Sequence, residues 1–155
     1  MALSVAEIAY LSIMRLIIAL LAFATPAAAW EFSADPVCTL TDETAEASLT
    51  VTYDPSLPEY AIAITLPEGT WPDAQTFGMA FAGGRDISIQ TDRHRLSNDG
   101  RTLTVTDRGF GNVLNGLEFN TRAYAILGDV TVGFTLEGID PAITAFRACP
   151  AVNMA

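Results

Sequence analysis

The side chains best suited to hold a charged ligand gather in the middle of the chain. Five of the eight arginines lie there, with the only histidine and four aspartates: Arg85, Arg93, Arg95, Arg101, Arg108, His94, Asp86, Asp92, Asp99 and Asp107. A guanidinium group presents its donors in a rigid plane that matches carboxylate and phosphate groups. Arg93, His94 and Arg95 are therefore candidate binding residues for an anionic ligand. The alternative, which the four aspartates favour, is a row of ion pairs between two neighbouring strands.

Residues for catalysis are scarce. The Asp92 carboxylate could orient the His94 imidazole, but no G-x-S-x-G nucleophile motif is present. The chain has no lysine, which excludes Schiff-base chemistry and the lysine of a phosphate-binding P-loop. Paired carboxylates such as Asp42 and Glu43 lack the ligand spacing of a calcium loop, and one histidine with two cysteines is too few for a structural zinc site. We therefore predict a protein that is not an enzyme, with no catalytic residue, no metal site and no cofactor. The alternative is a small anionic-ligand-binding or enzyme-like site on the arginine-rich hairpin at 85–108.

The two tryptophans could bind sugar rings by stacking. Trp71 lies beside Pro72 in an expected loop and is the better exposed candidate, so it joins Arg93, His94 and Arg95 in the candidate ligand site. Trp30 is instead expected to begin a strand and to close the β-sandwich that is predicted below for the mature chain.

A glycine-rich segment, Gly-Phe-Gly-Asn at 109–112, precedes an expected helix. Such a segment could cradle a phosphate, because glycine lets the backbone approach closely and a helix start offers free N–H groups. Its glycines do not follow the G-x-G-x-x-G spacing, and no lysine follows them. We expect instead a glycine-enabled crossover between two sheets, with Phe110 over a sheet edge.

The beginning of the chain has the pattern of a secretory signal. Arg15 precedes an apolar run at 16–23, then come Pro26 and the small residues 27–29. A membrane anchor is the alternative, but the apolar run is shorter than the roughly 18 residues that a span needs. We predict a signal peptide at 1–29, with Met14 as an alternative start, and no stable membrane span after cleavage.

Export and charge together restrict the partners. Acidic residues outnumber basic ones by 18 to 8, for a net charge of -10. Phosphate backbones and anionic lipid surfaces repel such a chain, so we expect no nucleic-acid partner. The expected partner is an unidentified envelope protein or a glycan.

The cysteine pair, Cys38 and Cys149, nearly brackets the mature chain. In an oxidising compartment two cysteines most simply form one disulfide, which would tie the first strand to the last element. A redox pair and intermolecular bridges are the alternatives, although no C-x-x-C motif is present.

Short segments of alternating apolar residues, separated by turn residues, fill most of the mature chain. We expect strands at 48–53, 60–66, 76–81, 86–91, 101–107, 123–127 and 130–136, with Asp99 and Gly100 in a hairpin turn. These segments are typical of an antiparallel sandwich or barrel rather than of βαβ units. One short helix is expected at 113–120 with Asn112 as its N-cap. Another should begin with Asp140 as N-cap and Pro141 at its first position, and end near Cys149.

No linker or repeat divides these segments, so we predict one domain at 30–149 and a flexible tail at 150–155. The predicted fold class is mainly β: an antiparallel β-sandwich with a short C-terminal helix and one disulfide. We expect the protein to be a monomer.

Several motifs follow one another along the mature chain: the leading Trp30, Cys38, Ile-Thr-Leu-Pro-Glu-Gly at 64–69, Phe-Thr-Leu-Glu-Gly at 134–138 and Ala-Phe-Arg-Ala-Cys at 145–149. Their order resembles the invasion-associated locus B family, small exported β-sandwich proteins of alphaproteobacteria. The resemblance covers most of the mature chain, although members of that family usually carry further cysteines in the middle, which this chain lacks. It implies a non-catalytic binding or structural protein of a Gram-negative envelope, periplasmic or secreted.

A second run, at 104–114, resembles uncharacterised exported proteins of the same bacteria. Some of those bear the name of an ABC excinuclease. The P-loop and helicase motifs of such an enzyme are missing from this sequence, so the resemblance implies no DNA-repair activity.

Overall fold

The computed structural model describes residues 30–152. The predicted signal peptide at 1–29, with its alternative start at Met14, lies outside the described residues, as do residues 153–155 of the predicted tail. Within 30–152, no helix is both long enough and apolar enough to cross a membrane.

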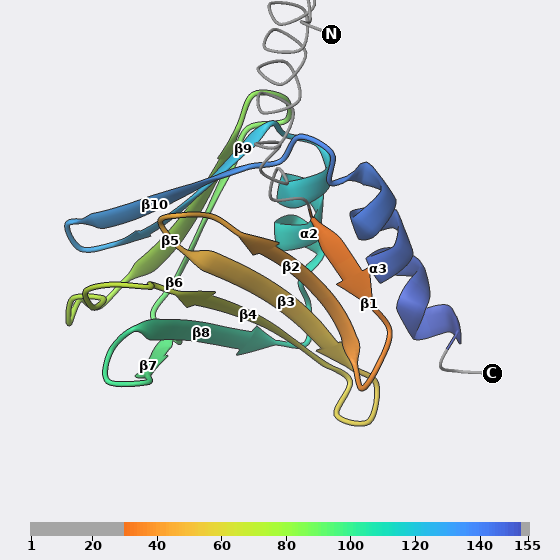
Figure 1. Cartoon of the computed structure of the whole chain (residues 1–155), viewed down its shortest axis with the longest axis horizontal. Helices are drawn as coiled ribbons and strands as arrows, with labels where there is room; N and C mark the ends of the chain where they lie inside the picture. Colours follow the sequence, from red (N-terminus) through yellow and green to blue (C-terminus); the bar gives the residue numbers. More distant parts are fainter. Residues whose placement is uncertain (1–29, 153–155) are drawn as a thin grey trace, which may run out of the picture.

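Two antiparallel sheets form the fold (Figure 1). Their inward residues share one hydrophobic core. The larger sheet has the order β1-β2-β3-β4-β8-β7, with β1 (Glu31–Ser33), β2 (Cys38–Glu43), β3 (Ser48–Asp54), β4 (Glu59–Thr65), β7 (Arg95–Ser97) and β8 (Thr102–Asp107). The smaller sheet has the order β10-β9-β5-β6, with β5 (Phe77–Ala82), β6 (Ile87–Thr91), β9 (Arg122–Leu127) and β10 (Val130–Thr135). The predicted mainly-β sandwich with a C-terminal helix and one disulfide is confirmed.

Strict alternation along the strands explains this pairing. In β3 and β4, Leu49 lies opposite Ile64 and Val51 lies opposite Ile62, and all four side chains are buried. Because successive side chains of a strand point to opposite faces, one apolar residue in two is enough to build each inner face. In β6 the same alternation gives only half-buried residues, Ile87 and Ile89.

One side of the sandwich is open. Strand β6 is one of the two edge strands of the smaller sheet, and β7 is one of the two edge strands of the larger sheet. Residues 92–94 connect these two outer strands and so pass from one sheet to the other. Strand β7 pairs only with residues 102–104 of β8, which leaves residues 105–107 of β8 without a neighbouring strand on that side among the described residues. Solvent can therefore reach the space between the two sheets through the gap between β6 and the end of β8.

Helix α2 (Gly111–Glu118) makes the crossover that was predicted between β8 and β9. The helix begins at Gly111, two residues before the predicted start at residue 113. Its N-cap is Phe110 instead of the predicted Asn112, and no side chain caps the helix. The glycines are not needed for this crossover, because neither Gly109 nor Gly111 has a positive φ and a side chain would meet open space at both.

Helix α3 (Asp140–Val152) packs against β1, β2 and α2, and Figure 1 shows it on the outer side of α2. The predicted start is wrong by one residue, since Asp140 is already helical and the Ile143 N–H donates to the Ile139 carbonyl at 2.9 Å. The helix continues to Val152, beyond the predicted domain end at residue 149. Residues 150–152 of the predicted tail are therefore helical.

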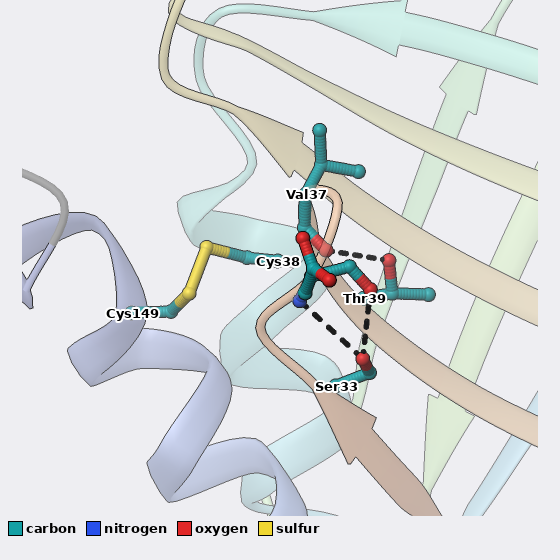
Figure 2. Close-up of a disulfide and its surroundings, with 6 residues drawn as sticks. Ser33, Val37, Cys38, Thr39 and Cys149 are labelled. Carbon is teal, nitrogen blue, oxygen red and sulfur yellow. Dashed lines mark hydrogen bonds between the residues drawn. A yellow bond between two sulfur atoms is a disulfide. The ribbon is translucent and has the colours of Figure 1, made fainter.

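The disulfide joins Cys38, the first residue of β2, to Cys149 on α3 (Figure 2). It was predicted to hold the first strand, but β1 precedes Cys38, so it holds the second. Next to it, the Thr39 Oγ1 hydroxyl donates to the Val37 carbonyl at 2.9 Å (Figure 2). The bridge thus fixes α3 to the larger sheet at a position where both sulfur-bearing residues are buried.

Candidate functional site

A small cavity lies between the two sheets on the open side of the sandwich, and we call it the interface cavity. Its volume is about 120 Å³. Both sheets, the crossover and the start of α2 contribute apolar side chains to its lining: Ile62, Phe77, Met79, Ile89, Val105, Phe110 and Val113. Strands β6 and β8 belong to different sheets and do not pair, and the inward residues of β6 are only half-buried. The inner faces of the two sheets are therefore only partly covered at this position.

An ion pair stands at the rim of this cavity. Arg93, from the connection between the sheets, donates through Nη2 to Oδ2 of Asp107 at the end of β8. The other carboxylate oxygen accepts the Arg108 backbone N–H at 2.7 Å. These hydrogen bonds, first of all the one from Arg93, hold the pKa of Asp107 below its usual range, so the carboxylate is ionised at neutral pH. The Arg93 side chain is 62% exposed and that of Asp107 is 35% exposed, so both remain accessible from solvent.

Arg93 and Asp107 also belong to a second hollow, which we call the polar groove. It encloses about 620 Å³ and is open to solvent. Three arginines and three carboxylates line it, with one histidine: Arg93, Arg95, Arg108, Glu59, Asp92, Asp107 and His94. The structure thus brings together three of the four predicted ligand residues, Arg93, His94 and Arg95. Their positive charge is offset by an equal number of acidic side chains.

His94 lies in the connection between β6 and β7. It is half-buried, and its ring lies 6.3 Å from the ring of Phe77, measured between centroids. Its Nδ1 atom is buried and makes no hydrogen bond to any described residue. The histidine therefore packs against the aromatic wall of the interface cavity while it also lines the polar groove.

Trp71 is not part of this site, and the prediction that it is exposed is wrong. It is 3% exposed, and its Nε1–H donates to the Ile64 carbonyl at 3.1 Å. The loop before it is tied to the tip of the β7–β8 hairpin, where the Trp71 N–H donates to the Gly100 carbonyl at 2.8 Å. The indole is thus a core side chain and has no free face for a sugar.

Two further arginines of the middle segment each contact a residue outside that segment. Arg85 lies over the ring of Phe119, with its Cζ atom 4.3 Å from the centroid, and Arg101 donates to the Pro67 carbonyl at 3.3 Å. Of the row of ion pairs that was the alternative interpretation, one is present among the described residues, between Arg93 and Asp107. The segment is neither a continuous basic face nor a ladder of ion pairs.

The apolar lining of the cavity was missed by reasoning from the sequence. Each of its residues has an inward position in an apolar pattern, which indicates core and gives no sign of a cavity. The one usable signal was Phe110, which was expected to cover a sheet edge and which lines the cavity, at 4% exposure.

Within the described residues, no three histidine, cysteine, aspartate or glutamate side chains are grouped so that they could hold a metal ion. What the arrangement can do is bind: an apolar cavity opens beside paired charges. Comparisons of the chain with protein-family models, with curated proteins and with solved structures find no match.

Proposed function

We propose that the chain is an exported, non-catalytic binding protein of the bacterial envelope, and that it holds a small, partly apolar ligand in the interface cavity. One observation carries this proposal: an apolar cavity between the sheets opens at a rim that bears an accessible ion pair. Ligand sites in proteins are typically concave and mostly apolar, with a few polar groups that orient the ligand.

Export is supported by two features far apart in the sequence. The signal-like pattern at 1–29 precedes the domain, and the domain holds a disulfide between Cys38 and Cys149. Disulfides persist in oxidising compartments such as the periplasm and are rare in the cytosol. The resemblance to the invasion-associated locus B family supports the same location.

The cavity can be tested with a neutral apolar probe, 3-methylbutan-1-ol, added to the purified oxidised protein during thermal unfolding. A ligand that binds only the folded protein raises its stability, by about 2.7 kcal/mol at one hundred times its Kd. We expect a saturable rise in melting temperature for the wild type. Ile89→Trp should abolish that rise, because Ile89 lines the cavity and the larger ring fills it.

Ile126→Trp is the matched control. Ile126 lies on β9 of the same sheet, is 37% exposed and does not line the cavity, so this variant should keep the response. A rise of equal size in all three proteins, or in none of them, would show that the cavity does not bind the probe and would overturn the proposal.

A second candidate function is the binding of a small anion in the polar groove. It is favoured by Arg95 and Arg108, which line the groove and make no ion pair with another described residue. If this function is the correct one, inorganic phosphate should stabilise the wild type, and Arg95→Gln should remove the effect. Phosphate without any effect on the melting temperature would eliminate it.

A further inference from the structure

The interface cavity and the polar groove meet at one place. Arg93 and Asp107 line both hollows, and the other arginines and carboxylates of the polar groove do not line the cavity. A ligand whose apolar group enters the cavity must therefore place its polar end beside this ion pair. The chemistry of that polar end can be inferred from the charges that it would meet.

The charges around the junction cancel. The groove holds Arg93, Arg95 and Arg108 against Glu59, Asp92 and Asp107. An anionic head group that takes Arg93 would leave the ionised Asp107 without its partner, and a cationic head group would leave Arg93 without its partner. Both cases leave one side chain of the pair without a partner of opposite charge, a cost that solvent reduces at this exposed rim. A head group with one charge of each sign can replace each partner of the ion pair and leave neither unpaired.

The cavity limits the size of the apolar group. Its volume of about 120 Å³ is somewhat smaller than the roughly 150 Å³ of an engineered protein cavity that binds benzene. A branched or aromatic group of about four to six carbon atoms fits this space, by the same comparison, and a long acyl chain does not.

We propose that the ligand is an apolar α-amino acid, with its side chain in the interface cavity and its ammonium and carboxylate groups between Asp107 and Arg93. This inference rests on the proposed binding function. In an α-amino acid the two charged groups and the side chain diverge from one carbon atom. That arrangement matches a junction where an apolar cavity, an arginine and an aspartate meet.

The test is a calorimetric titration of the purified oxidised protein with five compounds. Leucine carries both charges and the apolar side chain. N-acetylleucine keeps only the anion, leucinamide keeps only the cation, and 3-methylbutan-1-ol has neither charge. Glycine has both charges but lacks the side chain. Leucine should bind at least about tenfold more tightly than each of the others, since each of them lacks either one of its charged groups or its apolar side chain.

Variants locate the head group. Arg93→Gln and Asp107→Asn should each reduce the affinity for leucine about tenfold or more. Both residues lie at an exposed rim, so the melting temperature should change little. Arg122→Gln and Asp73→Asn remove the same types of charge from exposed positions outside both hollows and should leave leucine binding unchanged.

The outcomes separate this inference from the function on which it rests. Equal affinity for leucine and 3-methylbutan-1-ol, lost in Ile89→Trp, would overturn the amino-acid proposal and leave the binding function intact. Binding of N-acetylleucine in preference to leucine would also overturn it and favour the anion site. If none of the five compounds binds, both the inference and the proposed cavity function fail.

Discussion

Asp42 occupies an inward position of β2 and lies opposite Leu49 in the neighbouring strand. It is 4% exposed, and its Oδ2 atom makes no hydrogen bond to any described residue. Burial raises the pKa of this carboxyl above its ordinary value; the nearby Glu43 carboxylate acts in the same direction, and the Glu43 backbone N–H opposes it in part. The core therefore contains a carboxyl group that is easier to bury when it is protonated.

This burial predicts how stability depends on pH. Because the pKa is higher in the folded state, the Asp42 carboxyl favours folding fully below its unfolded pKa of about 3.9, and this contribution is lost as the pH rises through the folded value. Asp42→Asn cannot ionise. Its unfolding free energy, measured with urea, should therefore increase relative to that of the wild type between about pH 4 and pH 7.

Asp73→Asn serves as the control for that series, since Asp73 is exposed at the surface and lies in a loop outside both sheets. The same urea series on this variant measures the effect of removing an exposed carboxyl. A difference between Asp42→Asn and the wild type that does not change with pH would mean that the buried carboxyl does not titrate with a raised pKa.

At the scale of elements, α2 connects the sheets and links them to α3. Arg147 of α3 donates through Nη2 to Oδ1 of Asn115 at 2.8 Å, and its Nε lies 2.7 Å from Oε2 of Glu118. On its other side, α2 meets β5 at Gly116, where a Cβ atom would lie 2.4 Å from the Phe81 ring. The helix can approach the sheet this closely only because residue 116 has no side chain.

Gly116→Ala should therefore destabilise the fold although alanine is the better helix former. Crowding a packed core costs about 1–3 kcal/mol, which exceeds the helix-propensity gain of up to about 1 kcal/mol. Urea unfolding of Gly116→Ala measures the difference. Gly111→Ala, at the start of the same helix where a Cβ meets open space, should be neutral or slightly stabilising. Equal stability of the two variants would contradict the close approach of α2 to Phe81.

At the scale of the whole molecule, the disulfide closes a loop of 111 positions between β2 and α3. On the chain-entropy model such a bridge stabilises a fold by roughly 4–5 kcal/mol. Replacing both cysteines by serine should lower the melting temperature by about 10–20 °C. Calorimetry of the double variant and the oxidised wild type measures this shift. A melting temperature within a few degrees of the wild type would show that the bridge adds little to stability.

The sequence predicts the strands well where apolar residues alternate strictly, as in β3, β4 and β5, and it predicts the cysteine pairing. These features depend on the alternation of apolar residues along a short segment or on residue type. The burial of Trp71 could not be predicted, because it depends on a loop that reaches the distant residues Gly100 and Arg101. The interface cavity could not be predicted either. The cavity depends on the distance between β6 and β8. Each of its lining residues, taken alone, fits the sequence pattern of an ordinary core position.

The central claim, that the interface cavity binds a small ligand, can be tested most directly at one methyl group. Met79 lines the cavity, is 3% exposed and is the only methionine within residues 30–152. In protein labelled with ¹³C at the methionine methyl groups, the signal lost in Met79→Leu identifies this residue. Titration with leucine should shift that signal saturably in the wild type and in Ile126→Trp, and should not shift it in Ile89→Trp. A Met79 signal that stays in place during titration with leucine and with 3-methylbutan-1-ol would contradict the claim.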